Sequence, residues 1–192
     1  MRIAVLALQG AFVEHEEMLR RLGAEVFEVR NLRDWQQPKD GLVLPGGEST
    51  VQARLLRELS LFDPIRQSIL DGLPVMATCA GLILLARQEG GQPRSGLDTM
   101  DIDVVRNAYG RQLGSFNALG TIKGIDTEVP MPFIRAPYVA RTLSPDVEVL
   151  AKVDGRIVAV RQQHQLALAF HPELTNDRRL HQLFLALGSV GV

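Results

Sequence analysis

The chain has 192 residues, which suits one domain and leaves little room for a second, so we expect residues 1–192 to form a single domain. Hydrophobic residues make up 46% of the chain and charged residues 22%, proportions that are typical of soluble globular proteins. The 21 basic and 22 acidic residues give a formal net charge of -1 and form no basic run, so binding to nucleic acid or to an anionic membrane surface has no electrostatic support.

We expect a cytoplasmic protein. The apolar run at residues 3–8 is shorter than that of a signal peptide, and no run approaches the roughly 20 apolar residues of a membrane helix. The single cysteine, Cys79, excludes an internal disulfide framework and fits a reducing compartment.

The first half of the chain repeats a short apolar strand, a turn and an amphipathic helix. Strands are predicted at residues 3–8, 25–29, 41–44 and 74–77, and helices at residues 12–22, 49–59, 64–72 and 81–88. We expect Ser49 to cap the second of these helices and Asp63 to cap the third, with Pro64 in its first turn. Unbroken apolar strands are typical of a sheet that is covered on both faces.

The second half is less regular. Strands are predicted at residues 102–105, 147–153, 157–160 and 166–170, and a last helix at residues 177–187. Pro130, Pro132 and Pro137 indicate a loop-rich section between them. The alternation of strands and helices predicts an α/β fold, a mostly parallel sheet with helices on both faces. In such a sheet, functional residues gather at the carboxyl ends of the strands.

Cys79 is a candidate nucleophile because it lies on a very tight turn between a predicted strand and a predicted helix. Such a turn projects the sulfur outward, as in the nucleophile elbow of hydrolases. The amino terminus of a helix stabilises a thiolate, which is the nucleophilic form of cysteine. A buried cysteine that serves as a small hydrophobic residue is the alternative, and position alone leaves both open.

A nucleophilic thiolate needs a base, and three of the four histidines are poorly placed for that role. His15 lies on the apolar face of the first helix, where we expect a packed, hydrogen-bonded structural histidine. His181 lies inside the last helix without a catalytic context, and His164 lies in a polar stretch that indicates a hairpin or a strand end.

His171 is the better candidate, because it directly follows the strand predicted at residues 166–170. Glu173 comes two residues later, across Pro172, and in an extended segment both side chains fall on one face. A carboxylate beside an imidazole holds its tautomer and stabilises the imidazolium formed during reaction. The alternative is a proline-terminated strand with two polar surface residues.

The segment Pro-Gly-Gly-Glu-Ser at residues 45–49 also follows a buried strand and precedes a helix. Its glycines allow close approach of the backbone to a ligand and expose amide N–H groups. It lacks the lysine of a phosphate-binding P-loop and the glycine spacing of dinucleotide folds. An oxyanion hole, formed by amides of this loop and of the residue after Cys79, is one interpretation, and a simple strand–helix turn is the other.

Together these elements resemble the triad-type (class I) glutamine amidotransferases, and within them the glutaminase subunits of pyridoxal 5'-phosphate synthase. The resemblance covers nearly the whole chain in the expected order. It is carried by six segments, at residues 8–15, 44–50, 78–86, 106–112, 133–137 and 170–175.

The resemblance implies a flavodoxin-like three-layer sandwich and a glutaminase with the catalytic triad Cys79, His171 and Glu173. It implies an oxyanion hole from the amides of Gly47 and Ala80. The glutamine-binding positions that it implies are Gly46, Gly47, Glu48, Ser49, Arg106, Ile134 and Arg135. Arg106 or Arg135 is suited to the substrate carboxylate, because a guanidinium can pair with it bidentately, although a surface ion pair is the ordinary alternative.

The chain departs from the family pattern at two places. Ala77 stands where the family usually has the first glycine of its Gly-Thr-Cys-Ala-Gly elbow, and a methyl group there is expected to affect packing but not the nucleophile. The stretch at residues 162–165 lacks the glycine that the family more often carries near that turn, and it includes no catalytic position.

The implied reaction needs no metal or organic cofactor, since water is the second substrate. The implied partner is a (β/α)8 synthase subunit that forms a hetero-oligomer with the chain and receives ammonia from it. Two alternatives stay open: a glutaminase for another synthase, such as that of imidazole glycerol phosphate, and a non-catalytic flavodoxin-like interaction module. Residues 106–112 and 133–137 favour the vitamin B6 pathway over the first alternative.

Overall fold

A computed structural model describes residues 1–106 and 114–188. Its first half alternates strands and helices: β1 (Arg2–Leu6), α1 (Phe12–Arg21), β2 (Glu25–Val29), α2 (Leu32–Trp35), β3 (Gly41–Leu44), α3 (Ser49–Glu58), α4 (Phe62–Leu70), β4 (Val75–Thr78) and α5 (Ala80–Leu85). The second half is richer in strands: β5 (Ala86–Glu89), β6 (Gln92–Pro93), β7 (Met100–Val105), β8 (Ser115–Ile122), β9 (Ile125–Ile134), β10 (Tyr138–Thr142), β11 (Glu148–Val153), β12 (Arg156–Gln162), β13 (Gln165–Leu168), the 3-10 helix η1 (Pro172–Leu174) and α6 (Arg179–Leu187).

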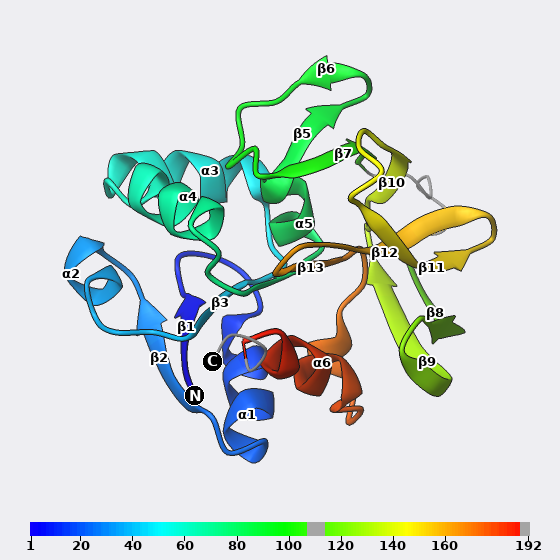
Figure 1. Cartoon of the computed structure of the whole chain (residues 1–192), viewed down its shortest axis with the longest axis horizontal. Helices are drawn as coiled ribbons and strands as arrows, with labels where there is room; N and C mark the ends of the chain where they lie inside the picture. Colours follow the sequence, from blue (N-terminus) through cyan, green and yellow to red (C-terminus); the bar gives the residue numbers. More distant parts are fainter. Residues whose placement is uncertain (107–113, 189–192) are drawn as a thin grey trace.

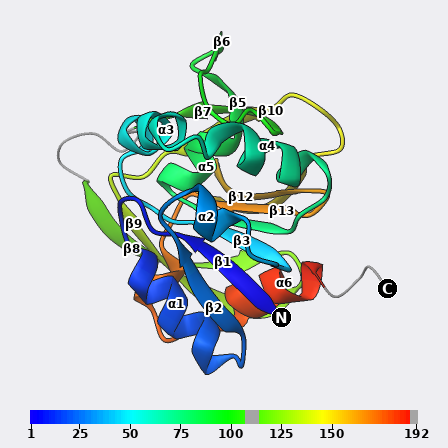
Figure 2. The same cartoon turned by 90° about the vertical axis from the view of Figure 1, so that its left-hand side faces the viewer.

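One large mixed sheet forms the centre of the molecule, in the order β2-β1-β3-β4-β13-β12-β10-β7-β5-β6, with β11 beside β12. Strands β2, β1, β3, β4 and β13 run parallel to one another, whereas β12 is antiparallel to β13 and the strands beyond it pair mostly antiparallel. Helices α1 and α6 cover one face of the parallel half, and α3, α4 and α5 cover the other (Figures 1 and 2). This confirms the predicted α/β fold with a mostly parallel sheet between two helical layers.

The strands that position the site are buried on both faces. Every residue of β3, β4 and β13 is buried, as their unbroken apolar sequences predicted. The registers place Leu44 beside Ala77 and Leu168 beside Thr78, so the three strands end at the same edge of the sheet. The loops that follow them therefore meet there.

Both predicted helix caps are wrong. Helix α3 is capped by Glu48, whose carboxylate accepts hydrogen bonds from the backbone N–H groups of Thr50 and Val51, while Ser49 is the first helical residue. Helix α4 begins at Phe62, so Asp63 lies in its first turn rather than before it, where its charge still complements the helix dipole.

The helix predicted at residues 81–88 ends early, at Leu85. The chain continues as β5, which pairs with β7 and, through a turn at Gly90 and Gly91, with β6. Hydrogen bonds of the sheet thus replace those of the helix over residues 86–89.

The loop-rich section predicted around Pro130 and Pro132 is a strand. Both prolines lie in β9, which pairs with β8 alone in a separate two-stranded sheet. A two-stranded sheet leaves one edge of each strand unpaired, and two residues separated by one position point their backbone nitrogens to the same edge. The carbonyl oxygen of Pro132 accepts a hydrogen bond from the N–H of His171, so this edge is the one that faces away from β8, and the prolines remove no hydrogen bond from the ladder.

None of the helices that the structure describes has both the length and the apolar character needed to cross a lipid bilayer.

Gly81 provides a test of how tightly α5 packs on β3. A Cβ atom there would lie 2.1 Å from the carbonyl oxygen of Leu44, which is backbone and cannot turn aside. We expect Gly81→Ala to lower the free energy of unfolding by about 2–3 kcal/mol, measured by urea denaturation. Gly114→Ala is the matched control, because a Cβ there meets no atom within 4 Å, and equal losses in both variants would contradict the packing.

Candidate active site

Cys79 lies on a strained turn between β4 and α5. Its backbone has φ 48° and ψ -99°, in a region that costs a residue other than glycine about 1–2 kcal/mol. The turn is held by the buried strand and by a hydrogen bond of 2.8 Å from the Cys79 N–H to the carbonyl oxygen of Leu168. Ala77, where the family usually has glycine, is fully buried in register with Leu44 and Ala167, so the sheet accommodates its methyl group.

His171 and Glu173 form a buried hydrogen-bonded pair after β13. His171 Nδ1 lies 2.7 Å from Glu173 Oε1, and the two residues are only 6% and 5% exposed, respectively. The expected extended His-Pro-Glu segment is wrong, because Pro172 begins the 3-10 helix η1. The φ of proline suits the first residue of a helical turn, and the short turn still brings the two side chains together.

The environment of His171 favours its charged form. Burial lowers the pKa of this imidazole, but hydrogen bonds to Cys79 and Glu173 and the charges of both partners outweigh burial and raise it to about 10. The pKa of Glu173 is lowered: burial raises it, yet the interactions with His15 and His171 prevail. The pair is therefore an imidazolium beside a carboxylate when Cys79 has given up its proton.

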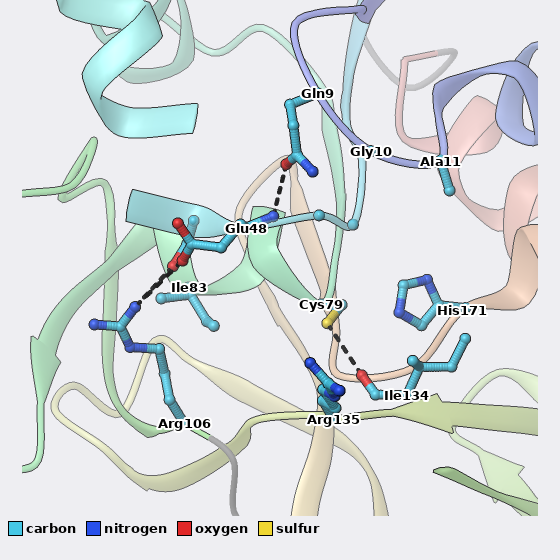
Figure 3. A pocket seen from close by; sticks show the side chains of 13 residues that line it. Gln9, Gly10, Ala11, Glu48, Cys79, Ile83, Arg106, Ile134, Arg135 and His171 are labelled. Atoms are coloured by element: carbon cyan, nitrogen blue, oxygen red, sulfur yellow. Dashed lines mark hydrogen bonds and ion pairs between the residues drawn. The ribbon is translucent and has the colours of Figure 1, made fainter. Parts of the chain in front are cut away.

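The residues of the loop after β3 lie against this pair and against the segment that follows β1. A Cβ atom on Gly46 would lie 2.3 Å from His171 Cε1, so only glycine fits between loop and imidazole. The carbonyl oxygen of Gly46 accepts a hydrogen bond of 3.2 Å from the N–H of Ala11. Gln9 Oε1 accepts one of 2.7 Å from the N–H of Glu48, so residues 9–11 hold the loop (Figure 3).

These elements enclose a cavity of about 510 Å³. Most of the predicted site residues line it: Gly46, Gly47, Glu48, Ser49, Cys79, Arg106, Ile134, Arg135 and His171. Glu173 lies behind His171, and Ala80 is buried in the first turn of α5, so neither lines the cavity. Ile134, at the end of β9, brings its carbonyl oxygen 3.9 Å from Cys79 Sγ (Figure 3).

The cavity also includes residues that were not predicted to line it, namely Gln9, Gly10, Ala11 and Ile83. Gln9 and its neighbours could have been found, because they follow the first buried strand and so obey the same strand-end rule as the others. Ile83 lies within a helix and has no such signal.

The two candidate arginines differ in their surroundings. Arg106 is held by Glu89 at 2.5 Å and by the hydroxyl groups of Ser49 and Thr50, each at 3.2 Å. Arg135 has φ 44°, and within residues 1–106 and 114–188 no carboxylate forms a salt bridge with it. Arg106 thus makes the ion pair that was the ordinary alternative, while Arg135 faces the cavity with its charge available.

His15 and His181 are buried, and His15 lies beside Glu173 and Thr78. His15 is a packed, hydrogen-bonded histidine as predicted: its Nδ1 lies 2.9 Å from His181 Nε2, and its Nε2 lies 3.2 Å from Thr78 Oγ1. Its Nε2 also lies 3.4 Å from Glu173 Oε2, a contact that the sequence did not indicate. His164 lies in the turn between β12 and β13, as predicted for a hairpin.

A cysteine elbow facing an imidazole–carboxylate pair at the carboxyl edge of a parallel α/β sheet defines the class of triad-type amidohydrolases. A profile of the SNO glutamine amidotransferase family matches residues 5–188. The chain therefore belongs to the SNO glutamine amidotransferase family.

Individual relatives agree with this assignment. Two proteins named pyridoxal 5'-phosphate synthase subunit PdxT are similar over nearly their full lengths. The one from Methanocorpusculum labreanum is 57% identical over 97% of this chain and 97% of its own, and the one from Desulfitobacterium hafniense is 55% identical over 96% and 92%. A solved structure described as a glutamine amidotransferase superimposes with a TM-score of 0.91 at 44% identity, covering 98% of this chain and 99% of its own.

The raised pKa of His171 is testable by titration of its ring nitrogens in 15N-labelled protein. We expect His171 to stay protonated until the pH approaches about 10, while Cys79→Ala lowers its pKa by removing a hydrogen bond that favours the imidazolium. Because the folded pKa exceeds the ordinary 6.5, this protonation stabilises the fold fully below pH 6.5, and the contribution is lost as the pH rises through about 10. Titration of His171 near 6.5 in the wild type would contradict this environment.

Proposed function

We propose that this chain is the glutaminase subunit of pyridoxal 5'-phosphate synthase and hydrolyses L-glutamine to L-glutamate and ammonia. The observation that carries the proposal is the near full-length identity of 53–57% to proteins of that name. It agrees with a cavity in which the proposed nucleophile, base and substrate-binding residues meet. This identity favours the proposal over a glutaminase for another synthase and over a non-catalytic interaction module.

The reaction begins from the pair in which the thiol proton of Cys79 has already passed to His171, and the thiolate attacks the amide carbon of glutamine. The C–N bond then breaks as His171 returns the proton to the leaving nitrogen, which departs as ammonia and leaves a γ-glutamyl thioester on Cys79. A water molecule, deprotonated by His171, hydrolyses the thioester to glutamate, and the sulfur leaves as the thiolate beside the protonated His171. Glu173 holds the imidazole throughout and stabilises its charged form.

The oxyanion formed in each attack needs donors, which we assign to the backbone N–H groups of Gly47 and Ala80. Ala80 opens α5, so its N–H belongs to the amino terminus of the helix and has no partner within it. The orientation of the peptide between Gly46 and Gly47 depends on the contact of Gly46 with Ala11. A partner that contacts residues 9–11 can therefore change the oxyanion loop, and we infer that the isolated subunit is weakly active.

The partner in this proposal is a (β/α)8 synthase subunit that forms a hetero-oligomer with the chain and receives ammonia through its interior. Transfer inside a complex keeps ammonia from being protonated or lost before it is used. The segment at residues 133–137 supports assignment to the vitamin B6 pathway and lies at the cavity, while residues 107–112 of the other supporting segment lie outside the described residues. The lone cysteine is compatible with a cytoplasmic location.

The first test is glutamate release from glutamine by the wild type and by Cys79→Ala, each with and without the cognate synthase subunit. We expect activity that rises with the synthase and falls by about 10³-fold or more in the variant, because the covalent route is closed. Cysteine-dependent activity that ignores the synthase would contradict the assigned partner. Absence of activity in every combination would leave the interaction module standing.

A second test concerns the substrate carboxylate, which we assign to Arg135. Loss of a charge-assisted hydrogen bond costs about 1.5–3 kcal/mol, so Arg135→Gln should raise KM by roughly 10- to 100-fold while kcat changes little. Arg106→Gln should raise KM less, because this guanidinium already pairs with Glu89. Steady-state kinetics of both variants in the complex, with the exposed Arg33→Gln as control, decide the assignment. A larger effect at Arg106 would reverse it.

A further inference from the structure

The carboxylate of Glu173 has one oxygen that the triad does not use. Oε1 accepts the hydrogen bond from His171 Nδ1, but Oε2 has no hydrogen-bond partner of good geometry among the residues that the structure describes. The side chain is fully buried, so this oxygen has no access to bulk water. A buried charged oxygen without a donor is costly, so a donor is expected nearby.

His15 places a ring nitrogen beside this oxygen. Its Nε2 lies 3.4 Å from Glu173 Oε2, and both side chains are fully buried. The same nitrogen lies 3.2 Å from Thr78 Oγ1, so a proton on this nitrogen would be shared between a hydroxyl group and a carboxylate. Catalytic hydrogen bonds are often long in a free enzyme and tighten when substrate binds, so a displacement of a few tenths of an ångström would complete the contact with Glu173.

The protonation of the two buried histidines decides which way the hydrogen bonds run. Burial lowers the pKa of His15, and burial together with the charge of His15 lowers that of His181 to about 2. Each ring is therefore neutral near pH 7 and carries one proton. Since His15 Nδ1 and His181 Nε2 are 2.9 Å apart, one of these two nitrogens donates to the other.

Only one of the two directions satisfies the carboxylate. If His15 Nδ1 donated, His15 Nε2 would present a lone pair to Glu173, and the remaining proton of His181 would lie on Nδ1, which has no partner among the described residues. If His181 Nε2 donates, His15 carries its proton on Nε2, facing Glu173 Oε2 and Thr78 Oγ1. The second arrangement leaves only an unused lone pair on His181, which costs less than a buried unpaired N–H.

We propose that His15 is a positioning residue for the triad, holding Glu173 through its second oxygen, and that His181 fixes the tautomer of His15. The hydrogen bonds then run in one direction, from His181 to His15 and from His15 to Glu173, where they meet the bond donated by His171. A carboxylate held at both oxygens cannot rotate. The Nδ1–H of His171 therefore stays hydrogen-bonded to Glu173, and its Nε2 stays directed at Cys79. This proposal rests on the catalytic roles proposed for Cys79, His171 and Glu173.

The alternative is a purely structural pair, in which His15 and His181 satisfy one another and join α1 to α6. Such a pair would affect stability alone. A positioning role would affect the protonation of Glu173 as well, because a hydrogen-bond donor at its second oxygen favours the carboxylate form. Other charged groups near Glu173 come from α1, where Glu14, Glu17 and Arg21 line the same surface hollow as Glu173, and they stay unchanged in the variants below.

The test compares His15→Gln, His15→Asn and His15→Leu in the complex with the synthase subunit. A glutamine side chain places its amide nitrogen at the position of His15 Nε2 and so keeps the donor to Glu173. An asparagine side chain places its amide nitrogen near the position of His15 Nδ1 instead. Leucine provides no hydrogen-bonding group at either position. We expect His15→Gln to retain most of the activity, and His15→Asn and His15→Leu to lower kcat by roughly 10- to 100-fold, as for a misplaced catalytic group. The acidic limb of the pH profile should shift to higher pH in these two variants, since Glu173 becomes easier to protonate.

His181 is tested in the same way, because glutamine again preserves a donor at Nε2. His181→Gln should retain more activity than His181→Leu. The leucine variant lacks the donor to His15 Nδ1, so the proton of His15 is no longer held on Nε2. Leu19→Ala controls for stability, since Leu19 is fully buried on the same helix as His15. It should lower the midpoint of urea unfolding without moving the pH profile.

A second measurement does not depend on glutaminase activity. In 15N-labelled protein the Nδ1 proton of His171 should be strongly deshielded in the wild type and His15→Gln, and should broaden or move upfield in His15→Asn and His15→Leu. Equal spectra and pH profiles in all folded variants would overturn the positioning role while leaving the glutaminase intact. If His15→Leu does not fold, equal activity of His15→Asn and His15→Gln overturns it. An inactive wild type would count against the proposed function, and the spectra would still decide the role of His15.

Discussion

The site depends on the alignment of three buried parallel strands, β3, β4 and β13. Because their registers end them at one edge, the loop at Gly46, the elbow at Cys79 and the pair that begins at His171 come together without any long connection. The strands are buried on both faces, so a slip of one residue would exchange the side chains that pack against the two helical layers and would displace the residue at the end of the strand. Packing in the core thus fixes the distances between the residues of the active site.

Close contacts at two glycines also determine the positions of the segments that line the cavity. Gly81 lies against the carbonyl oxygen of Leu44, which fits α5 closely to β3, and Gly46 lies against the imidazole of His171, where no side chain would fit. The strained backbone of Cys79 persists because both neighbours are held in this way. Rigid surroundings are what a short-lived tetrahedral intermediate requires, since donors that must reorganise stabilise it less.

The apolar strands and the residues that follow them predicted the parallel half of the fold, the loop at residues 45–49, Cys79 and His171, whereas the positions of Arg106, Ile134 and Arg135 in the site were implied only by the resemblance to the family. The sequence did not predict β8 and β9, since Pro130 and Pro132 are strong signals for loops unless the strand has a free edge. The cap at Glu48 was missed because serine is the commoner cap and the two are adjacent. The contact between His15 and Glu173 joins residues that are 158 positions apart and has no local signature, so only the packing of α1 beside η1 reveals it.

The prolines of β9 have a consequence for how another molecule can approach this side of the cavity. The backbone edge that faces away from β8 has lost the N–H donors of Pro130 and Pro132, and the carbonyl oxygen of Pro132 is already occupied by the N–H of His171 at 2.9 Å. Addition of a foreign strand needs alternating donors and acceptors, which this stretch no longer offers. The wall of the cavity is thereby protected from strand-to-strand association, and a protein that docks beside Ile134 must recognise side chains instead of backbone.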